Sequence, residues 1–289
     1  MSELKKFTVK GTKKIELDDF STDEKIKKTE KEKILAKTEE NRKKIAEYQD
    51  KLYSEGKESI LIILQAMDAA GKDGTIKHVM SGLNPQGIDV YSFKSPNSEE
   101  LSHDYMWRAI KRLPEKGKMA IFNRSYYEDV LIGKVHKLYE NQKMADRCKQ
   151  GDVIGRRYKE IKNFEKYIFN NSCRIIKIFL HLSKEEQKKR FLERIDLKIK
   201  NWKFSTSDIK ERQYWDEYQQ AYEDAINETS TKDCPWYIIP ADQKFYARYL
   251  VSEAILDVMK KIDPKYPTLP EEERRHLIED KELLLSENN

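Results

Sequence analysis

The sequence predicts an α/β fold in which helices cover both faces of a central parallel sheet. Segments with strand and helix patterns alternate from about residue 59 to residue 262. The strands expected at 60–64 and 175–180 are almost continuously apolar, which is typical of parallel strands that are buried on both faces. Small and polar residues follow the strand ends, where open α/β sheets bind their ligands.

Hydrophobic periodicity, Gly and Pro positions and helix caps define the elements in order. The first fifty or so residues are dense in Lys and Glu, and they predict one or two long amphipathic helices that follow a capping box at Ser21 and Glu24 and end near Gly56. The expected strands are 59–66, 88–93, 119–123, 174–182 and 236–239. The expected helices are 72–81, 97–111, 126–136, 152–169, one capped by Ser183 with Glu186, 207–227 and 245–262.

Composition narrows the class of protein. Charged residues make up 37% of the chain and hydrophobic residues 38%, so an ionised surface surrounds a substantial core. No apolar run approaches the roughly 20 residues that span a bilayer, and the first residues lack the apolar segment of a signal peptide. Cys148, Cys173 and Cys234 form no C-x-x-C pair, so neither a disulfide framework nor a Cys-based zinc site is indicated. We expect a cytoplasmic protein with no membrane partner.

Residues 59–75, SILIILQAMDAAGKDGT, give the strongest motif. An apolar strand leads into a small-residue loop, a Lys and a segment with helix pattern, which is typical of a phosphate-binding P-loop. Gly71 and Lys72 fit the pattern G-x-x-x-x-G-K-[ST]. Ala66 replaces its first Gly, and Asp73 stands where a hydroxyl would reach Mg²⁺. A plain strand-to-helix turn with an exposed Lys is the alternative.

Residues 119–129, MAIFNRSYYED, form a second cluster of polar side chains beyond a strand. P-loop enzymes often end such a strand with an acid that helps to hold Mg²⁺, but this position is the neutral Asn123. Glu128 and Asp129 follow as candidate metal ligands, although acids are favoured in any first helical turn. Arg124 is placed for bidentate phosphate contact.

The segment 184–212, which we name the lid segment, concentrates positive charge. It has ten basic and six acidic residues, an excess of four in a chain whose net charge is +5. Arg190, Arg194 and Lys198 recur every four residues and share one helical face. A solvated charged helix would look similar, but the P-loop upstream favours a mobile lid that clamps phosphates.

Together these motifs resemble polyphosphate kinase family 2. The match lies in DAAGK at 68–72, F-x-R-S-x-Y at 122–127 and R-F-x-x-R followed by K-x-W-K at 190–203, and it covers about residues 30–262. The resemblance implies a three-layer α/β/α P-loop kinase fold of the thymidylate-kinase type. We expect an N-terminal helical extension at 1–56, a phosphotransferase domain at 57–262 with its helical lid at about 184–212, and a charged tail at 263–289.

The resemblance also implies an activity. Enzymes of this family transfer phosphoryl groups between inorganic polyphosphate and nucleotides, use Mg²⁺, for which Mn²⁺ can substitute, and usually assemble as homo-oligomers such as dimers or tetramers. Asn123 together with Glu128 resembles class III, whose members phosphorylate nucleoside monophosphates and diphosphates. We therefore expect AMP and ADP, and also guanine nucleotides, as substrates.

By position, the resemblance makes Asp68 the Walker A aspartate, with its lysine at Lys72. Arg124 matches the phosphate-binding arginine of the second motif. The lid arginines, also expected to be catalytic, are Arg190 and Arg194. Residues expected to bind phosphates or the nucleotide are Ala69, Ala70, Gly71, Asp73, Gly74, Thr75, Lys77, Lys94, Asn123, Ser125, Lys198 and Lys203. The expected metal ligands are Asp68, Glu128 and Asp129.

Two other functions remain open at this point. A nucleoside-monophosphate kinase that uses ATP as donor would carry a similar P-loop. A non-catalytic module that binds polyanions or nucleic acid would need exposed aromatic residues among its basic residues, and only the region of Trp202 resembles this. No nucleic-acid partner is expected.

Overall fold

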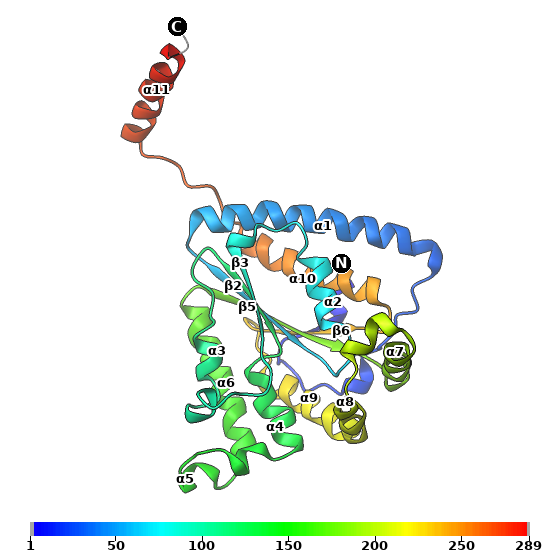
Figure 1. The fold of residues 1–289 in the computed structure, drawn as a ribbon. Helices are drawn as coiled ribbons and strands as arrows, with labels where there is room; N and C mark the ends of the chain where they lie inside the picture. Colours follow the sequence, from blue (N-terminus) through cyan, green and yellow to red (C-terminus); the bar gives the residue numbers. More distant parts are fainter. Residues whose placement is uncertain (1–2, 288–289) are drawn as a thin grey trace.

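A six-stranded sheet forms the centre of the molecule, with the strand order β1-β6-β5-β2-β4-β3 (Figure 1). This computed structural model describes residues 3–287. Strands β2 to β6 are parallel, whereas β1 pairs with β6 in the antiparallel direction at one edge. The predicted central parallel sheet is confirmed, and the antiparallel edge strand is an addition to it.

The strands lie where the apolar runs predict them, within one residue at each end. They are β2 (Ser59–Gln65), β3 (Ile88–Ser92), β4 (Met119–Asn123), β5 (Cys173–His181) and β6 (Trp236–Pro240). The unpredicted β1 (Thr8–Val9) has only two residues, which is too short to produce a periodic pattern.

Helices cover the sheet on both faces, which confirms the three-layer arrangement (Figure 1). One face is covered by α1 (Lys28–Glu55), α2 (Lys72–Val79) and α10 (Lys244–Ile262), and the other by α3 (Trp107–Ile110), α4 (Ile132–Val135), α6 (Val153–Asn170) and α9 (Trp215–Thr229). An apolar core lies on each face of the sheet, and strand β2 contributes side chains to both. Its side chains alternate, so that Leu61 and Ile63 point to one core and Ile62 and Leu64 to the other.

Some predicted helices are interrupted. The expected helix 97–111 is reduced to a 3₁₀ turn at Glu100–Ser102 and the short α3, and 126–136 divides into a 3₁₀ turn at Tyr126–Val130 and α4. The expected helix 207–227 divides into α8 (Thr206–Glu211), a 3₁₀ turn at Arg212–Tyr214 and α9. Helix α7 (Lys184–Asp196) and a 3₁₀ segment at Lys198–Lys203 complete the lid segment. The other short elements are Glu3–Phe7, Leu17–Asp19, Pro85–Gly87, Leu138–Asn141 and α5 (Asp146–Lys149).

The predicted capping box at Ser21 and Glu24 is wrong. The Ser21 hydroxyl instead hydrogen-bonds with the backbone of Asp23, two residues later, and α1 begins at Lys28 with no side-chain cap. Ser side chains readily make such short local bonds, and these compete with helix initiation. The second predicted capping box is confirmed on its Ser side, since the Ser183 hydroxyl accepts from the Glu186 N–H at 3.1 Å.

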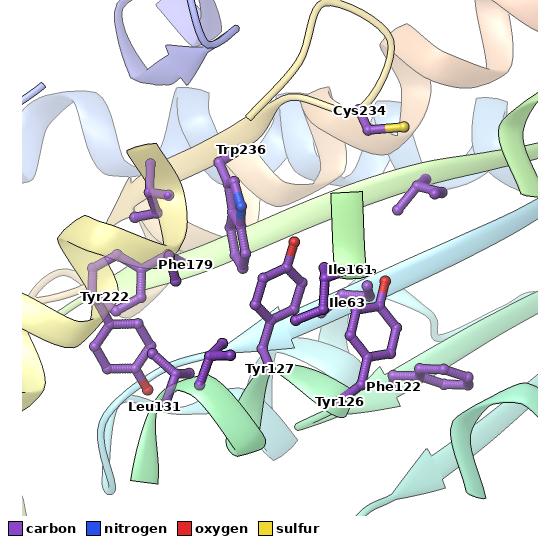
Figure 2. Packing of buried hydrophobic residues seen from close by; sticks show 14 of the residues in the cluster. Ile63, Phe122, Tyr126, Tyr127, Leu131, Ile161, Phe179, Tyr222, Cys234 and Trp236 are labelled. Carbon is purple, nitrogen blue, oxygen red and sulfur yellow. The ribbon is translucent and has the colours of Figure 1, made fainter. Parts of the chain in front are cut away.

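A polar network lies inside the core directly below the end of β4. The rings of Tyr126 and Tyr127 pack in this core, and Tyr127 meets Trp236 edge-on with 4.8 Å between ring centroids (Figure 2). Both tyrosine hydroxyls contact Glu165, which also forms a fully buried ion pair with Lys177 at 2.6 Å. Buried charges are tolerated only when they are paired in this way, so the network fixes the chain immediately after Arg124.

The two ends of the chain differ in how they contact the sheet and its helices. Near the N-terminus, α1 packs against α10, where the Asn41 amide donates to the Ser252 hydroxyl at 3.0 Å. At the other end, α11 (Glu271–Ser286) extends away from the sheet, and all of its residues are exposed (Figure 1). None of the helices within residues 3–287 combines the length and apolar character that crossing a bilayer requires.

Candidate active site

The loop between β2 and α2 forms the floor of the site. Ala69 and Gly71 both adopt left-handed backbone conformations, with φ of 62° and 104°. Gly71 is the residue that precedes α2, and a side chain there would be strained, which explains the small residues of the motif. The Lys72 ammonium donates to the carbonyl oxygens of Ala66 at 2.7 Å and Met67 at 3.4 Å. Burial, and next the charge of Arg124, lower the pKa of Lys72.

Arg124 joins this loop to the end of β4. Its guanidinium lies 2.8 Å from the Asp68 carboxylate and 3.5 Å from the Glu128 carboxylate, and its backbone is left-handed with a φ of 65°. Burial would lower the pKa of Arg124, but the two carboxylates outweigh burial and raise it. Burial raises the pKa of Glu128, against the opposing charges of Arg124 and Lys72. At the floor of the site, the negative charges of two carboxylates, Asp68 and Glu128, therefore balance the positive charges of Arg124 and Lys72.

Asn123 connects the second motif to the unusual acid of the loop. Its amide donates to the Asp73 carboxylate at 2.8 Å. Asp73 occupies the place of the usual Ser or Thr, and the neutral Asn123 occupies the place of the usual acid. The two departures from the common P-loop pattern are thus in direct contact.

Helix α7 packs against the loop and contacts its backbone. Arg190 is only 4% exposed, and its guanidinium donates to the carbonyls of Ala69 at 3.1 Å and Ala70 at 2.9 Å. The same group donates to the carbonyls of Ala241 at 2.7 Å and Asp242 at 3.0 Å. One turn further along the helix, Arg194 instead contacts the lid segment itself.

Two cavities lie on either side of the loop. The larger, of about 570 Å³, lies between the loop, the end of β3 and the lid segment. The smaller, of about 210 Å³, lies between the loop, α7 and α10. Six cations and one carboxylate line the smaller cavity, namely Arg190, Arg194, Lys200, Lys203, Lys244, Arg248 and Glu193. Arg194 and Lys203 line both cavities.

Most of the predicted site residues meet at these cavities. Those lining the larger cavity are Asp68, Ala69, Ala70, Gly71, Lys72, Asp73, Gly74, Lys94, Asn123, Arg124, Arg194 and Lys203. Thr75 and Arg190 line the smaller cavity only. The residues from the three motifs therefore share one region at the carboxyl ends of the strands, as the parallel sheet predicts.

Five predicted residues line neither cavity: Glu128 contacts Arg124 at the floor of the site, and the other four lie elsewhere. Ser125 is fully buried, and its hydroxyl accepts from the Tyr127 N–H at 3.1 Å. The side chains of Lys77 and Lys198 are exposed, and neither is among the described residues that line the two cavities. Asp129 lines a separate cavity of about 400 Å³.

Asp129 and Glu128 diverge because they are neighbours in a 3₁₀ turn, where successive side chains point about 120° apart. Asp129 accepts from the Gln142 amide at 3.1 Å and lies 3.5 Å from the Arg157 guanidinium. Burial raises the pKa of Asp129, and Arg157 opposes this effect. The structure therefore brings Glu128, but not Asp129, to Asp68.

Sequence reasoning missed several residues of the site. Lys244 and Arg248 lie one turn apart on α10 and line the smaller cavity. Burial, and next the charge of Arg190, lower the pKa of both groups. Because α10 begins beyond the carboxyl end of β6, the rule that located the first two motifs could have found them. Lys200 and Trp202 belong to the predicted K-x-W-K motif, and although no site role was predicted for them, they also line the cavities.

The oxygen ligands present suit a magnesium ion shared with a substrate. Within residues 3–287, no three His, Cys, Asp or Glu side chains gather closely enough to hold a metal by themselves. Mg²⁺ commonly binds one or two carboxylates and completes its shell with water and substrate phosphate oxygens. Asp68, with Glu128 behind Arg124, supplies that kind of partial site.

Comparisons with known proteins agree with this geometry. A family model described as polyphosphate kinase 2 (PPK2) matches residues 27–267. An ADP-polyphosphate phosphotransferase of Rhodopseudomonas palustris is 47% identical over 247 residues, which cover 84% of either chain. An AMP/ADP-polyphosphate phosphotransferase of Meiothermus ruber is 44% identical over 225 residues, which cover 78% of this chain and 80% of that one. The crystal structure of polyphosphate kinase 2 from Arthrobacter aurescens TC1 superimposes with a TM-score of 0.81 at 37% identity, covering 92% of this chain and 93% of that one.

Proposed function

This chain belongs to the polyphosphate kinase 2 family, and we propose that it uses inorganic polyphosphate to phosphorylate both AMP and ADP. The observation that carries the proposal is the pair of cavities on either side of one phosphate-binding loop. A transfer between two phosphate compounds needs two such places that meet at one point. The relative from Meiothermus ruber, named for both AMP and ADP, supports the pair of acceptors. GDP is expected as a further acceptor, since a 33% identical relative is named for it.

We place the donor chain in the smaller cavity and the nucleotide in the larger one. The smaller cavity has six cations against one carboxylate, which suits a polyanion whose charge repeats along its length. The larger cavity has a volume that accommodates a nucleotide, and it includes the aromatic side chains of Phe93 and Trp202. Arg194 and Lys203 line both, so the transferred phosphoryl group would pass beside them.

Positioning and neutralisation of charge carry the proposed mechanism. Donor and acceptor are both anions, and their repulsion is the main obstacle to in-line transfer. An acceptor phosphate oxygen is already ionised near neutral pH, so no strong general base is needed. Lys72 and the loop N–H groups would bind phosphate oxygens, while Arg124 and Arg194 would stabilise charge on the transferred group. Arg190 would hold the loop in the required shape.

Asp68 is the residue proposed to hold Mg²⁺, for which Mn²⁺ can substitute, with Glu128 supporting it. When bound, the ion would neutralise phosphate charge and align donor with acceptor. We further propose that the protein is cytoplasmic, where nucleotides are abundant, and that it assembles as a homo-oligomer, a dimer or tetramer. Gel filtration with light scattering would test the assembly.

A direct assay tests the proposal. Purified protein is incubated with polyphosphate, Mg²⁺ and either AMP, ADP or GDP, and the products are separated by chromatography. Conversion of AMP through ADP to ATP is expected. Activity on ADP alone would reject the AMP step, and transfer to AMP from ATP but not from polyphosphate would indicate a nucleoside-monophosphate kinase instead.

Asp68→Asn tests the central role of the loop acid. The substitution keeps the side-chain size but removes the charge that we assign to the metal, so polyphosphate-dependent formation of ADP and ATP should be abolished while the unfolding curve is retained. Asp216→Asn, at an exposed position in the first turn of α9, serves as the matched control and should keep full activity. Near-normal turnover by the Asp68 variant would reject the assignment.

A further inference from the structure

Asp208 is a lid carboxylate to which neither the motifs nor the proposed mechanism assigns a task. It lies in α8, whose first turn is capped by the Ser205 hydroxyl. Its carboxylate oxygen lies 3.4 Å from the Arg194 guanidinium, and the two side chains are 19% and 21% exposed. Asp208 and Arg194 thus form a largely buried ion pair inside the lid segment.

The same guanidinium nitrogen of Arg194 has a second acceptor. It donates to the backbone carbonyl of Lys203 at 3.2 Å. The Asn201 amide also donates to the carbonyls of Arg194 at 2.8 Å and Ile195 at 2.7 Å, which fixes the turn between α7 and the 3₁₀ segment. One carboxylate and one carbonyl therefore set the direction of a cation that lines both cavities.

Asp208 also lies within electrostatic reach of the floor of the site. Burial, and next the carboxylate of Asp68, raise the pKa of Asp208. Arg194 has the largest opposing effect, and Arg124 and Lys72 add to it. An acid on the outer surface of the lid would not interact with the loop in this way.

We propose that Asp208 is a positioning residue for phosphoryl transfer, because its carboxylate holds the Arg194 guanidinium where the two cavities meet. The inference rests on the proposed function. A guanidinium without a fixed acceptor samples many rotamers, and small displacements of a charged group reduce transition-state stabilisation strongly. The carboxylate of Asp208 acts through Arg194 and does not itself contact the substrates.

A double-mutant cycle tests this role. Arg194→Ala, Asp208→Ala and the double variant are compared with the wild type for turnover and for KM with polyphosphate and with ADP. Asp208→Ala should lower kcat by about ten-fold and Arg194→Ala by ~10², while the double variant should be no slower than Arg194→Ala alone. Asp208→Asn keeps an oxygen acceptor and the side-chain size, so it should lose less than Asp208→Ala and should fold if the alanine variant does not.

The possible results distinguish a failure of the positioning role of Asp208 from a failure of the proposed function on which it rests. Asp196→Asn, at an exposed position on the same lid, is the control and should behave as the wild type. Independent, multiplicative losses in the double variant, or wild-type kinetics in both Asp208 variants, would overturn the positioning role while leaving the proposed function intact. A wild-type protein that transfers nothing from polyphosphate would overturn both.

Discussion

The two ends of helix α7 use the same residue type for different purposes. At its inner end, which we call the root, Gln187 and Arg190 donate to backbone carbonyls of the loop from Asp68 to Ala70. At its outer end, which we call the tip, Arg194 contacts Asp208 and Lys203 of the lid segment and lines both cavities. Arg190 is almost fully buried, whereas about a fifth of the Arg194 side chain is exposed.

The comparison teaches that a shared helical face does not imply a shared role. Arg190 and Arg194 are one turn apart and look equivalent in the sequence. The carbonyl groups that Arg190 binds belong to the backbone, so this contact shapes the loop. The cation of Arg194 is directed to the region between the cavities, so it is available to phosphates. The root should therefore govern both stability and activity, and the tip should govern mainly activity.

The largest effect is expected from Arg190→Ala. The substitution removes the donor for the carbonyls of Ala69, Ala70 and Ala241 and leaves the Glu186 carboxylate only its exposed ion pair with Lys189. We expect a loss of about 3 kcal/mol or more in the free energy of unfolding, together with a fall in turnover above 10² because the loop loses its shape. Urea unfolding and polyphosphate-dependent turnover measure the two quantities. Full stability with lost activity would show that Arg190 has the same role as Arg194 and would contradict the difference proposed between the two residues.

Arg194→Ala should separate activity from stability. A cation that stabilises the transferred group contributes mainly to the rate, so kcat should fall by about 10², while loss of the partly exposed ion pair with Asp208 should lower the free energy of unfolding by only about 1 kcal/mol, well below the loss expected for Arg190→Ala. Lys198→Ala is the matched control and should leave kcat unchanged within about two-fold, because α7 ends at Asp196 and the exposed Lys198, contrary to the prediction, does not continue the face of Arg190 and Arg194. A change confined to thermal stability would assign Arg194 a purely structural role.

The smallest effect is expected for Glu128 at the floor of the site, and it concerns the pH dependence of the protein's stability. Burial raises the pKa of Glu128 in the folded protein above its value in the unfolded chain. Folding therefore favours the protonated form, and stability declines as pH rises through the folded pKa, because the carboxylate must then ionise while buried. Glu128→Gln has no such cost, so its melting temperature should equal that of the wild type in acid and exceed it increasingly toward neutral pH.

This prediction extends the comparison to the floor of the site, where we expect ionisation of a buried carboxylate to lower stability. Melting curves from about pH 4 to pH 8 provide the measurement. Glu217→Gln, at an exposed position in the first turn of α9, should show no pH-dependent difference. A variant that becomes less stable than the wild type as pH rises would show that Arg124 and Lys72 overcompensate the burial of Glu128.

The sequence was sufficient to predict the parallel strands and the polar loops beyond their carboxyl ends. Apolar runs such as 59–65 and 173–181 have one dominant explanation, a buried strand, and the small residues after the first run mark the loop. The Ser183 cap was also predictable, because it depends on residues three positions apart. These features are encoded locally, in residues that are neighbours along the chain.

Features that depend on distant parts of the chain could not be predicted. Whether Arg190 binds backbone or substrate depends on the position of Ala241, about fifty residues later. Successive side chains diverge by about 100° in an α-helix and by about 120° in a 3₁₀ turn, so Glu128 and Asp129 point apart in either case. Which of the two points toward Asp68 depends on how the turn packs against the rest of the chain. The predicted helix 97–111 begins with a capping box between Asn97 and Glu100, but it stops after one turn, where the His103 backbone is extended and the Asp104 carboxylate accepts from the Met106 N–H.

The contact of Arg190 with both the loop and the end of β6 also has a consequence for synthesis on the ribosome. The loop residues Ala69 and Ala70 emerge early, but their contact with Ala241 through Arg190 requires roughly 170 further residues, which take about ten to thirty seconds to translate. Until then a nascent chain has the full loop sequence without the contacts that fix its shape. The ability to bind phosphate should therefore appear late and abruptly, only after Ala241 has been translated.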